Sequence, residues 1–249
     1  MIIDESLCTR CTECVAYCPV QAIHIHKAEK RVQVSLDECV ECGVCLRAQV
    51  CPTGALQQQP LSWPRTIRSA LSDPLVVHPE TRIPGRGTEE MKTNDVTGRY
   101  RVGRVGLALE MGRPGAGAGF RDIQRVAQKM ATLGVTFEPL NPVTKMMSDP
   151  TAGTFPREIL GERVLSAIIE FDLPVAQLPQ AIQAAREVAQ EIDTVFSLDI
   201  CALVHGNEKL PLPDLIRQQG LEPSLNGKTN VGLGRPIFDF ALAAEGQVS

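Results

Sequence analysis

Apolar positions in the second half of the chain repeat with two alternating periods. Runs rich in Val, Leu and Ile are long enough for buried strands, and the segments between them carry an apolar residue at every third or fourth position. The first pattern is typical of a strand inside a sheet, and the second of an amphipathic helix. We therefore predict a domain with strands at residues 101–112, 135–140, 162–173 and 195–204, a helix from residue 120 that ends at Gly134, and a helix at residues 178–192.

Each predicted helix has an apolar stripe that would face the sheet. The stripe residues are Ile123, Val126, Met130 and Leu133 in the first helix, and Leu178, Ile182, Ala185, Ala189 and Ile192 in the second. Gly134 is expected to end the first helix. The predicted order β-α-β-β-α-β is that of the ferredoxin-like split βαβ sandwich, so the fold class is α+β.

The chain before residue 101 shows neither pattern for long. Five prolines occur between Pro60 and Pro84, and the apolar residues there are not periodic, so we predict a connecting segment with at most a short helix after Ser62. The predicted organisation is a small N-terminal domain at residues 1–59, a linker or docking segment at 60–100, the α+β domain at 101–206 and an extension at 207–249.

Eight of the nine cysteines lie in the small N-terminal domain, in two runs of similar spacing. The first run is C-x2-C-x2-C-x3-C-P and begins at Cys8, and the second is C-x2-C-x2-C-x5-C-P and begins at Cys39. The sequences CPVQAI and CPTGAL at their ends make the runs an internal repeat. Three thiolates at three-residue steps can reach three corners of one iron–sulfur cubane, with a remote cysteine as the fourth ligand.

These runs resemble the bacterial two-cluster ferredoxin family, in which the fourth cysteine of each run binds the other cluster. The resemblance implies two 4Fe–4S clusters as cofactors. The implied ligands are Cys8, Cys11, Cys14 and Cys51 for the first cluster, and Cys39, Cys42, Cys45 and Cys18 for the second. The five residues between Cys45 and Cys51 depart from the usual three, which leaves the local geometry there open but removes no ligand.

Two zinc sites are the alternative reading of these cysteines. Zinc sites usually pair two C-x2-C elements that lie a dozen or more residues apart. His24 and His26 could then be ligands, but with eight cysteines assigned to clusters we expect both to be strand residues facing solvent. The ninth cysteine, Cys201, lies in an apolar strand, so we expect a buried small side chain rather than a nucleophile.

A glycine-rich turn precedes the first predicted helix of the α+β domain. The sequence GRPGAGAGF places Arg113, Gly115, Gly117 and Gly119 just before a helix N-terminus, where free N–H groups favour an anion. With the strand before it and the step LGV after the helix, the Arg-Pro-Gly turn resembles the opening of an ACT domain, although Gly117 and Gly119 are insertions. The resemblance implies a dimerising or ligand-sensing module, and the free N–H groups at the turn would favour a small anionic effector. Tight-turn geometry alone would also explain the glycines.

Charge and composition narrow the classes of function. The formal net charge is −4, and only residues 60–104 are basic, with six basic residues from Arg82 to Arg104. This basic segment could be a solvated linker or a docking arm, and no recognisable motif accompanies it, so we do not expect a nucleic-acid partner. No apolar run is long enough to span a bilayer, and the first residues lack a signal-peptide pattern. We therefore expect a soluble, cytoplasmic protein.

The expected function is electron transfer. Two clusters would pass single low-potential electrons to a partner oxidoreductase, and the ACT-like domain would provide dimerisation, docking or effector control. We find no catalytic triad, no HExxH motif and no acid–base pair, so an enzyme activity of the chain itself is not expected. The alternatives are a redox-linked small-molecule sensor or regulatory subunit, and a tightly bound subunit of a complex in anaerobic metabolism. A homodimer or a complex subunit is expected in each case.

Overall fold

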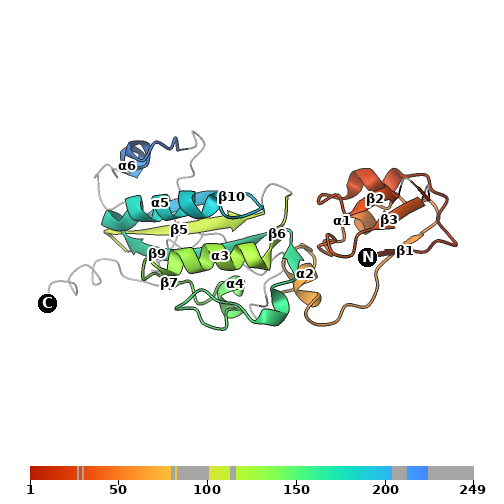
Figure 1. Ribbon diagram of the computed structural model, residues 1–249, viewed down its shortest axis with the longest axis horizontal. Helices are drawn as coiled ribbons and strands as arrows, with labels where there is room; N and C mark the ends of the chain where they lie inside the picture. Colours follow the sequence, from red (N-terminus) through yellow and green to blue (C-terminus); the bar gives the residue numbers. More distant parts are fainter. Residues whose placement is uncertain are drawn as a thin grey trace, which may run out of the picture.

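A computed structural model of the chain shows two lobes that meet at a short helix, α2 (Thr66–Ala70) (Figure 1). The structure describes residues 1–26, 28–29, 31–79, 82, 101–112, 116–203 and 212–223. The cysteine-rich residues form the small lobe, which contains the N-terminus, and the residues from 101 onward form the large lobe. No helix in these ranges is long and apolar enough to cross a membrane.

The small lobe is built from short paired strands around the two cysteine runs. β1 (Ile2–Ile3) pairs with β4 (Leu56–Gln57), and β2 (Ile23–His26) pairs with β3 (Arg31–Val34), both antiparallel. A 3-10 helix, Glu13–Tyr17, and a single-turn helix α1 (Val44–Arg47) lie within the two runs. The buried residues that cluster into the core of this lobe are Met1, Ile23, Val32, Cys45 and Leu56. A core this small leaves much of the folding free energy to be supplied by bound metal.

The large lobe is built on a four-stranded antiparallel sheet of order β10-β5-β9-β7. Its strands are β5 (Arg104–Met111), β7 (Thr136–Phe137), β9 (Ala167–Pro174) and β10 (Phe196–Ala202). Two helices, α3 (Phe120–Ala131) and α5 (Leu178–Ala189), lie side by side across one face of this sheet (Figure 1). The sheet and its helices make this part of the chain α+β, with the strands and helices in the predicted order.

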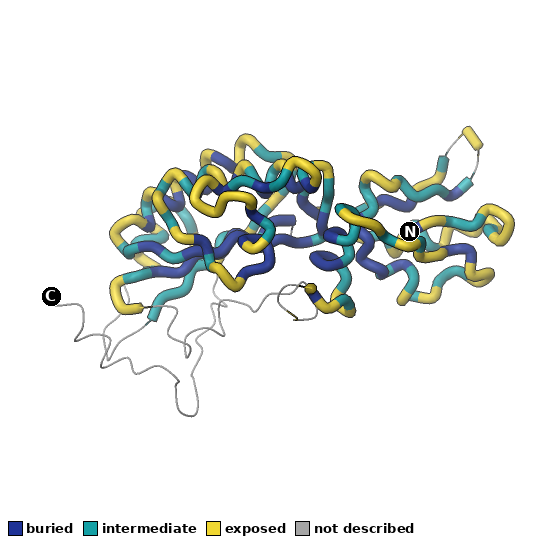
Figure 2. The backbone as a smooth tube through the Cα atoms, turned by 90° about the horizontal axis from the view of Figure 1, so that it is seen from below, coloured by how far each residue is buried: buried dark blue, intermediate teal, exposed yellow. Residues whose placement is uncertain are grey.

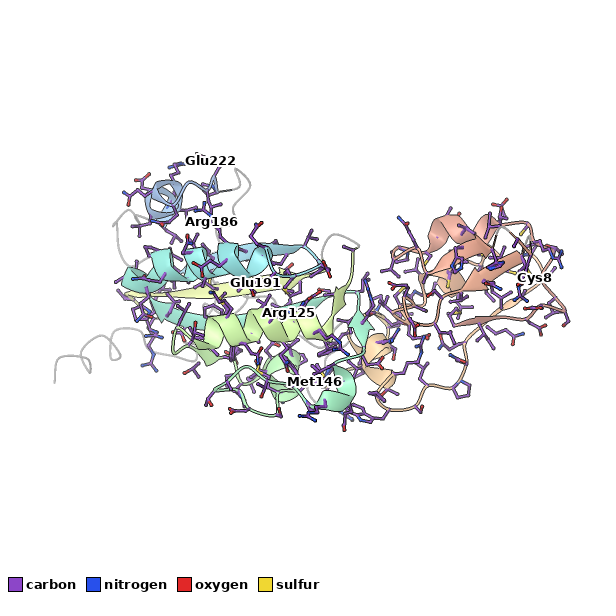
Figure 3. All side chains as sticks on the ribbon, viewed as in Figure 1. Cys8, Arg125, Met146, Arg186, Glu191 and Glu222 are labelled. Atoms are coloured by element: carbon purple, nitrogen blue, oxygen red, sulfur yellow. The ribbon has the colours of Figure 1, made fainter. Side chains whose placement is uncertain are left out.

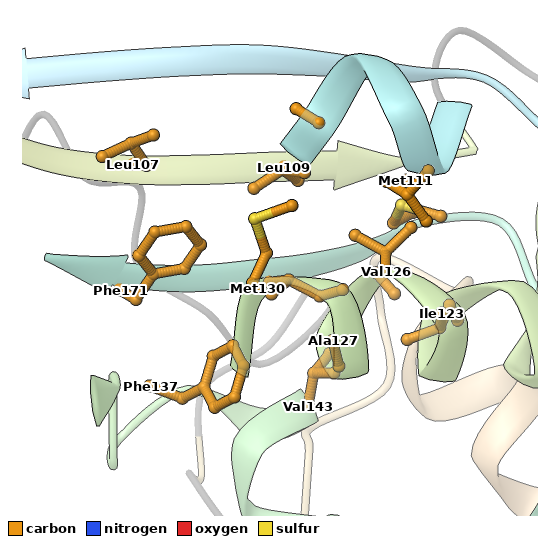
Figure 4. Packing of buried hydrophobic residues seen from close by; sticks show 14 of the residues in the cluster. Leu107, Leu109, Met111, Ile123, Val126, Ala127, Met130, Phe137, Val143 and Phe171 are labelled. Carbon is orange, nitrogen blue, oxygen red and sulfur yellow. The ribbon is translucent and has the colours of Figure 1, made fainter. Parts of the chain in front are cut away.

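The core of the large lobe lies between the sheet and the two helices (Figure 4). Successive side chains of a strand point to opposite faces, so Leu107, Leu109 and Met111 of β5 all point toward the helices. Met130 and Val126 of α3 meet them there, and all five side chains are at most 1% exposed. The other face of β5 carries Ala108, which packs with Ile168 and the half-buried Cys201. Cys201, which we expected to be a buried small side chain, is therefore half-buried against apolar neighbours.

The predicted strand at residues 162–173 is divided in two. β8 (Arg163–Val164) pairs with β6 (Ala118–Gly119) in a separate two-stranded sheet, and β9 begins only at Ala167. At the break, the backbone N–H of Leu165 donates to the hydroxyl of Ser72 at 2.8 Å. A hydrogen bond to a residue far away in the sequence thus ends a strand that the apolar pattern predicted to continue.

Both predicted helices end earlier than expected. α3 ends at Ala131 in a closing turn. In this turn the Leu133 N–H donates to the Met130 carbonyl, and the N–H of Gly134, whose φ is 69°, donates to the Ala131 carbonyl. α5 ends at Ala189, which is exposed, whereas Val188 is buried, so the predicted stripe was wrong at this position. The predicted strand at 135–140 contributes only the two residues of β7 to the sheet.

The first part of the segment predicted as a linker is packed. Ile67 and Leu71, on and beside α2, belong to the core of the large lobe, so α2 is buried at the junction of the lobes (Figure 2). Most of the basic segment 82–104 lies outside the described residues, as does most of the C-terminal extension. The remaining elements are α4 (Pro142–Lys145), α6 (Leu212–Gln218) and 3-10 helices at Arg157–Ile159 and Val175–Gln177.

Candidate metal centres

The structure brings the eight cysteines of the small lobe together in two groups of four, each around a cavity. Site 1 is lined by Cys8, Cys11, Cys14 and Cys51, and site 2 by Cys18, Cys39, Cys42 and Cys45. Cys18 and Cys51 therefore each lie with the three cysteines of the other run. The two four-thiol hollows are closely matched in size, at about 310 Å³ for site 1 and 330 Å³ for site 2 with the solvent at their mouths included.

The lining of both cavities fits a 4Fe–4S cluster. Four cysteine thiolates are its usual ligands, and the other lining residues are mainly apolar, such as Ile3 and Val32 at site 1 and Ile23 at site 2. Within the described ranges, no three His, Cys, Asp or Glu side chains converge closely enough to hold a single ion. A four-iron cluster instead needs its thiolates spread around a larger body. His24 is exposed and His26 half-buried, and neither lines a cavity.

The two cysteine loops share an unusual backbone conformation. Arg10 and Thr12 in the first loop have φ of 61° and 67°, and Glu41 and Gly43 in the second have φ of 55° and 67°. These left-handed residues, two and four positions after the first cysteine of each run, turn the chain tightly. The tight turn allows three cysteines at three-residue steps to face one cavity. The internal repeat of the sequence therefore extends to the backbone.

The exchanged cysteines also accept equivalent hydrogen bonds. Ala22 N–H donates to Cys18 Sγ, and Ala55 N–H donates to Cys51 Sγ, both at 3.1 Å. Both alanines occupy the same place in the repeated sequences CPVQAI and CPTGAL, which gives that repeat a structural reason. An N–H group directed at a ligand sulfur stabilises negative charge, and such bonds are among the factors that set cluster potentials.

The cysteines of site 2 are more buried than those of site 1. Cys42 and Cys45 are buried, and burial, together with the neighbouring thiolates of Cys42 and Cys39, raises the pKa of the Cys45 thiol to about 11. At site 1, Cys11 is exposed. Burial alone would raise the pKa of Cys51 too, but N–H groups of residues 53, 55 and 56 and a threonine hydroxyl lower it to about 7. The two sites thus differ in how far their cysteines are buried.

The sites also differ in their position relative to the large lobe. Cys8 of site 1 lies toward the outer end of the small lobe, away from the large lobe (Figure 3). Site 2 faces the junction: a Cβ atom added at Gly117 of the large lobe would lie 3.5 Å from Val20 and 4.0 Å from Val40. Both valines line site 2. The turn at Gly117 in the large lobe therefore lies next to the wall of site 2.

The glycine-rich turn before α3 lies at this junction. Gly112 has φ 80°, and its carbonyl oxygen accepts hydrogen bonds from the N–H groups of Ala116 and Gly117. The Gly117 carbonyl accepts from the Thr194 hydroxyl at 2.6 Å, and Phe120 N–H, at the start of α3, donates to the Glu162 carbonyl. Arg113 and Gly115 of the predicted ligand turn lie outside the described residues. An anion site at this turn stays a prediction.

Gly112→Ala is expected to destabilise the large lobe by at least about 2 kcal/mol, measured by urea denaturation. A Cβ there would lie 2.7 Å from the backbone of Gly117 and 2.8 Å from the Leu165 oxygen, at a positive φ. Gly119→Ala is the matched control, because its Cβ would point into open space at φ −83°. Gly119→Ala should lower the free energy of unfolding by less than about 1 kcal/mol. Equal losses in the two variants would contradict this account of the turn.

Comparison with known proteins assigns the small lobe. Residues 7–55 match the family model of the 4Fe-4S dicluster domain. The protein named Ferredoxin 7Fe from Hydrogenibacillus schlegelii is 31% identical over 71 residues, which are 27% of this chain and 86% of that protein. No solved structure matches the chain. The dicluster domain and its eight cysteines imply two bound 4Fe–4S clusters. Through this N-terminal domain, the chain belongs to the ferredoxins that carry a 4Fe–4S dicluster.

Proposed function

We propose that the protein carries single electrons between redox partners. The observation that supports this most directly is the pair of four-cysteine cavities, each completed by a cysteine from the other run. In this proposal Cys8, Cys11, Cys14 and Cys51 hold one cluster, and Cys39, Cys42, Cys45 and Cys18 hold the other. The bound clusters supply one-electron chemistry. The chain binds them, surrounds them with apolar side chains, and directs N–H groups at two of the sulfurs.

Electron exchange with a partner oxidoreductase is proposed at site 1. Cys11 is exposed and Cys8 half-buried, and Leu7 beside them is 43% exposed. Site 2, by contrast, has two buried cysteines and borders the large lobe. A partner protein can approach site 1 without displacing any part of the large lobe that the structure describes.

The large lobe is proposed to be an ACT-like split βαβ sandwich. Its strands, numbered within the lobe, have the antiparallel order 4-1-3-2, and two helices cover one face, which supports this fold assignment. The lobe would provide dimerisation, partner docking or effector control, with a small anion at the turn before α3. In this role the chain is a homodimer or the subunit of a larger redox complex.

A redox-linked sensor or regulatory subunit is the second candidate function. It is favoured by the contacts that join the turn to site 2. Gly117 of the turn lies next to the wall of site 2. Glu162 accepts from Phe120 N–H through its carbonyl, and its carboxylate pairs with Arg68 of α2. An effector bound at the turn would therefore lie next to residues that contact site 2.

The test is anaerobic purification of the full chain, followed by iron and sulfide analysis, native mass spectrometry and electron paramagnetic resonance. We expect about eight iron atoms per chain and one-electron reduction at each cluster. Two bound zinc ions and no iron–sulfur absorbance would overturn the proposal. A dimer that retains a small-molecule mass would favour the sensor, and clusters without such an adduct would favour the plain carrier.

A further inference from the structure

A buried arginine of α2 holds the loop that leads into site 2. The side chain of Arg68 is 5% exposed. The two N–H groups of its Nη1, one of them shared between acceptors, donate to the carbonyl oxygens of Leu36 and Asp37 at 2.9 Å and of Cys39 at 2.7 Å. Cys39 is the first cysteine of the second run. A single buried cation therefore fixes three backbone carbonyls immediately before and at a cysteine of site 2.

The same guanidinium is bound by the large lobe. Its Nε donates to the carboxylate of Glu162, whose side chain is 13% exposed. Glu162 belongs to the segment just before β8, and its own carbonyl is held by Phe120 N–H at the start of α3. The Arg68 guanidinium thus donates to the site 2 loop through Nη1 and to a carboxylate of the large lobe through Nε, and its side chain is almost fully shielded from solvent.

Two further arginines contact the same loop. Arg65 donates to the Leu36 carbonyl at 2.9 Å and to the buried carboxylate of Glu41. Arg47 donates to the Cys42 carbonyl at 2.6 Å and pairs with Asp73 at 2.8 Å. Three guanidinium groups therefore surround the loop at residues 36–42, although each is paired with one carboxylate.

The corresponding loop of site 1 has a different environment. In the part of the chain that the structure describes, the carbonyls of residues 5–11 accept no arginine hydrogen bond, and the Leu7 carbonyl accepts one from the Thr53 hydroxyl. Arg10, which takes the position of Glu41 in the repeat, is exposed. The repeated cysteine loops are therefore alike in backbone but unlike in the charges that contact them.

We propose that Arg68 is a positioning residue of the second cluster site, and that it makes site 2 the site of higher reduction potential. It orders the Cys39 loop, and its charge is buried where solvent screens it little, so it stabilises an added electron nearby. Glu162 opposes this effect from the far side of the guanidinium. The large lobe thereby sets part of the charge balance at site 2. This inference depends on the proposed function, because it requires a cluster at each site.

The two halves of the ion pair should shift the same potential in opposite directions. Arg68→Gln removes the positive charge and should lower one of the two cluster potentials. Glu162→Gln removes the opposing negative charge and should raise that same potential. Arg68→Lys keeps the charge and should restore most of the loss, even though one ammonium cannot make all the contacts of the guanidinium. A merely structural role would not give shifts of opposite sign.

The experiment is a redox titration of the anaerobically purified full chain, followed by electron paramagnetic resonance, with iron counted for every variant. Arg10→Gln is the matched control, because Arg10 lies between two cysteines of site 1. Arg10→Gln should shift only the reduction potential of the cluster at site 1. We expect all variants to retain about eight iron atoms per chain, with the higher wild-type potential as the one that responds to Arg68 and Glu162.

Three results would overturn the inference while leaving the proposed function intact: unchanged potentials, equal shifts of both, or a shift of the lower one. If Arg68→Gln does not fold, Glu162→Gln alone decides, since an upward shift of the higher potential is still required. A wild-type chain without two clusters would instead overturn the proposed function. Iron content therefore separates the two failures.

Discussion

Cys18→Ala is expected to remove the cluster of site 2 and to leave that of site 1, so that iron falls from about eight to about four atoms per chain. Cys18 comes from the first run but lies with Cys39, Cys42 and Cys45 around the second cavity. Three thiolates would leave that cluster one ligand short. Iron and sulfide analysis of the anaerobically purified variant measures the loss.

Double variants test the exchange of ligands directly. Cys18→Ala with Cys39→Ala removes two ligands of the same proposed cluster, so about four iron atoms should remain. Cys18→Ala with Cys8→Ala removes one ligand from each cluster, and iron should fall close to zero. If each run held its own cluster, these two results would be interchanged. Cys201→Ala is the control, because this half-buried cysteine lies in the large lobe, and it should retain all the iron.

The candidate sites could be predicted from the sequence because their determinants are local. The three-residue steps between cysteines act within one tight loop, and the repeated loops have nearly the same φ values. The expected grouping of Cys18 and Cys51 with the opposite runs came from the resemblance to two-cluster ferredoxins, not from spacing. The cavities now place these cysteines with those runs, although the ligand assignment itself stays a proposal until iron is counted.

The difference between the two sites could not be predicted, because it depends on contacts between distant parts of the chain. Arg68 and Leu36 are 32 residues apart, and Arg68 and Glu162 are 94 apart. The sequence allowed a short helix after Ser62, but nothing in its pattern showed which charges that helix would bring to the Cys39 loop. The two arginines of this segment, Arg65 directly after Pro64 and Arg68 three residues later, were the signal that the sequence offered.

The same limit explains the errors in the large lobe. The apolar pattern of residues 162–173 is continuous and therefore predicted one strand. The break depends on the hydrogen bond from Leu165 N–H to the hydroxyl of Ser72, which lies just after α2. Ala189 was assigned to the buried stripe because alanine suits either face of a helix, and packing of α5 buries Val188 instead. Turn and cap contacts decided these positions, and hydrophobic periodicity does not report them.

Leu109→Ala is expected to destabilise the large lobe by about 3–5 kcal/mol, because it opens a cavity that the sheet and helices cannot close. Leu109 is 0% exposed at the centre of β5, opposite Leu198 of β10 and Ile169 of β9 (Figure 4). Urea denaturation of the full chain, followed by circular dichroism, measures the loss. Leu140→Ala removes the same atoms from a side chain that is 58% exposed, so it should change the free energy of unfolding by no more than about 0.5 kcal/mol. Similar losses in the two variants would mean that the core does not lie between β5 and the helices. A loss of iron in Leu109→Ala without added denaturant would show instead that the small lobe depends on the large lobe for its fold.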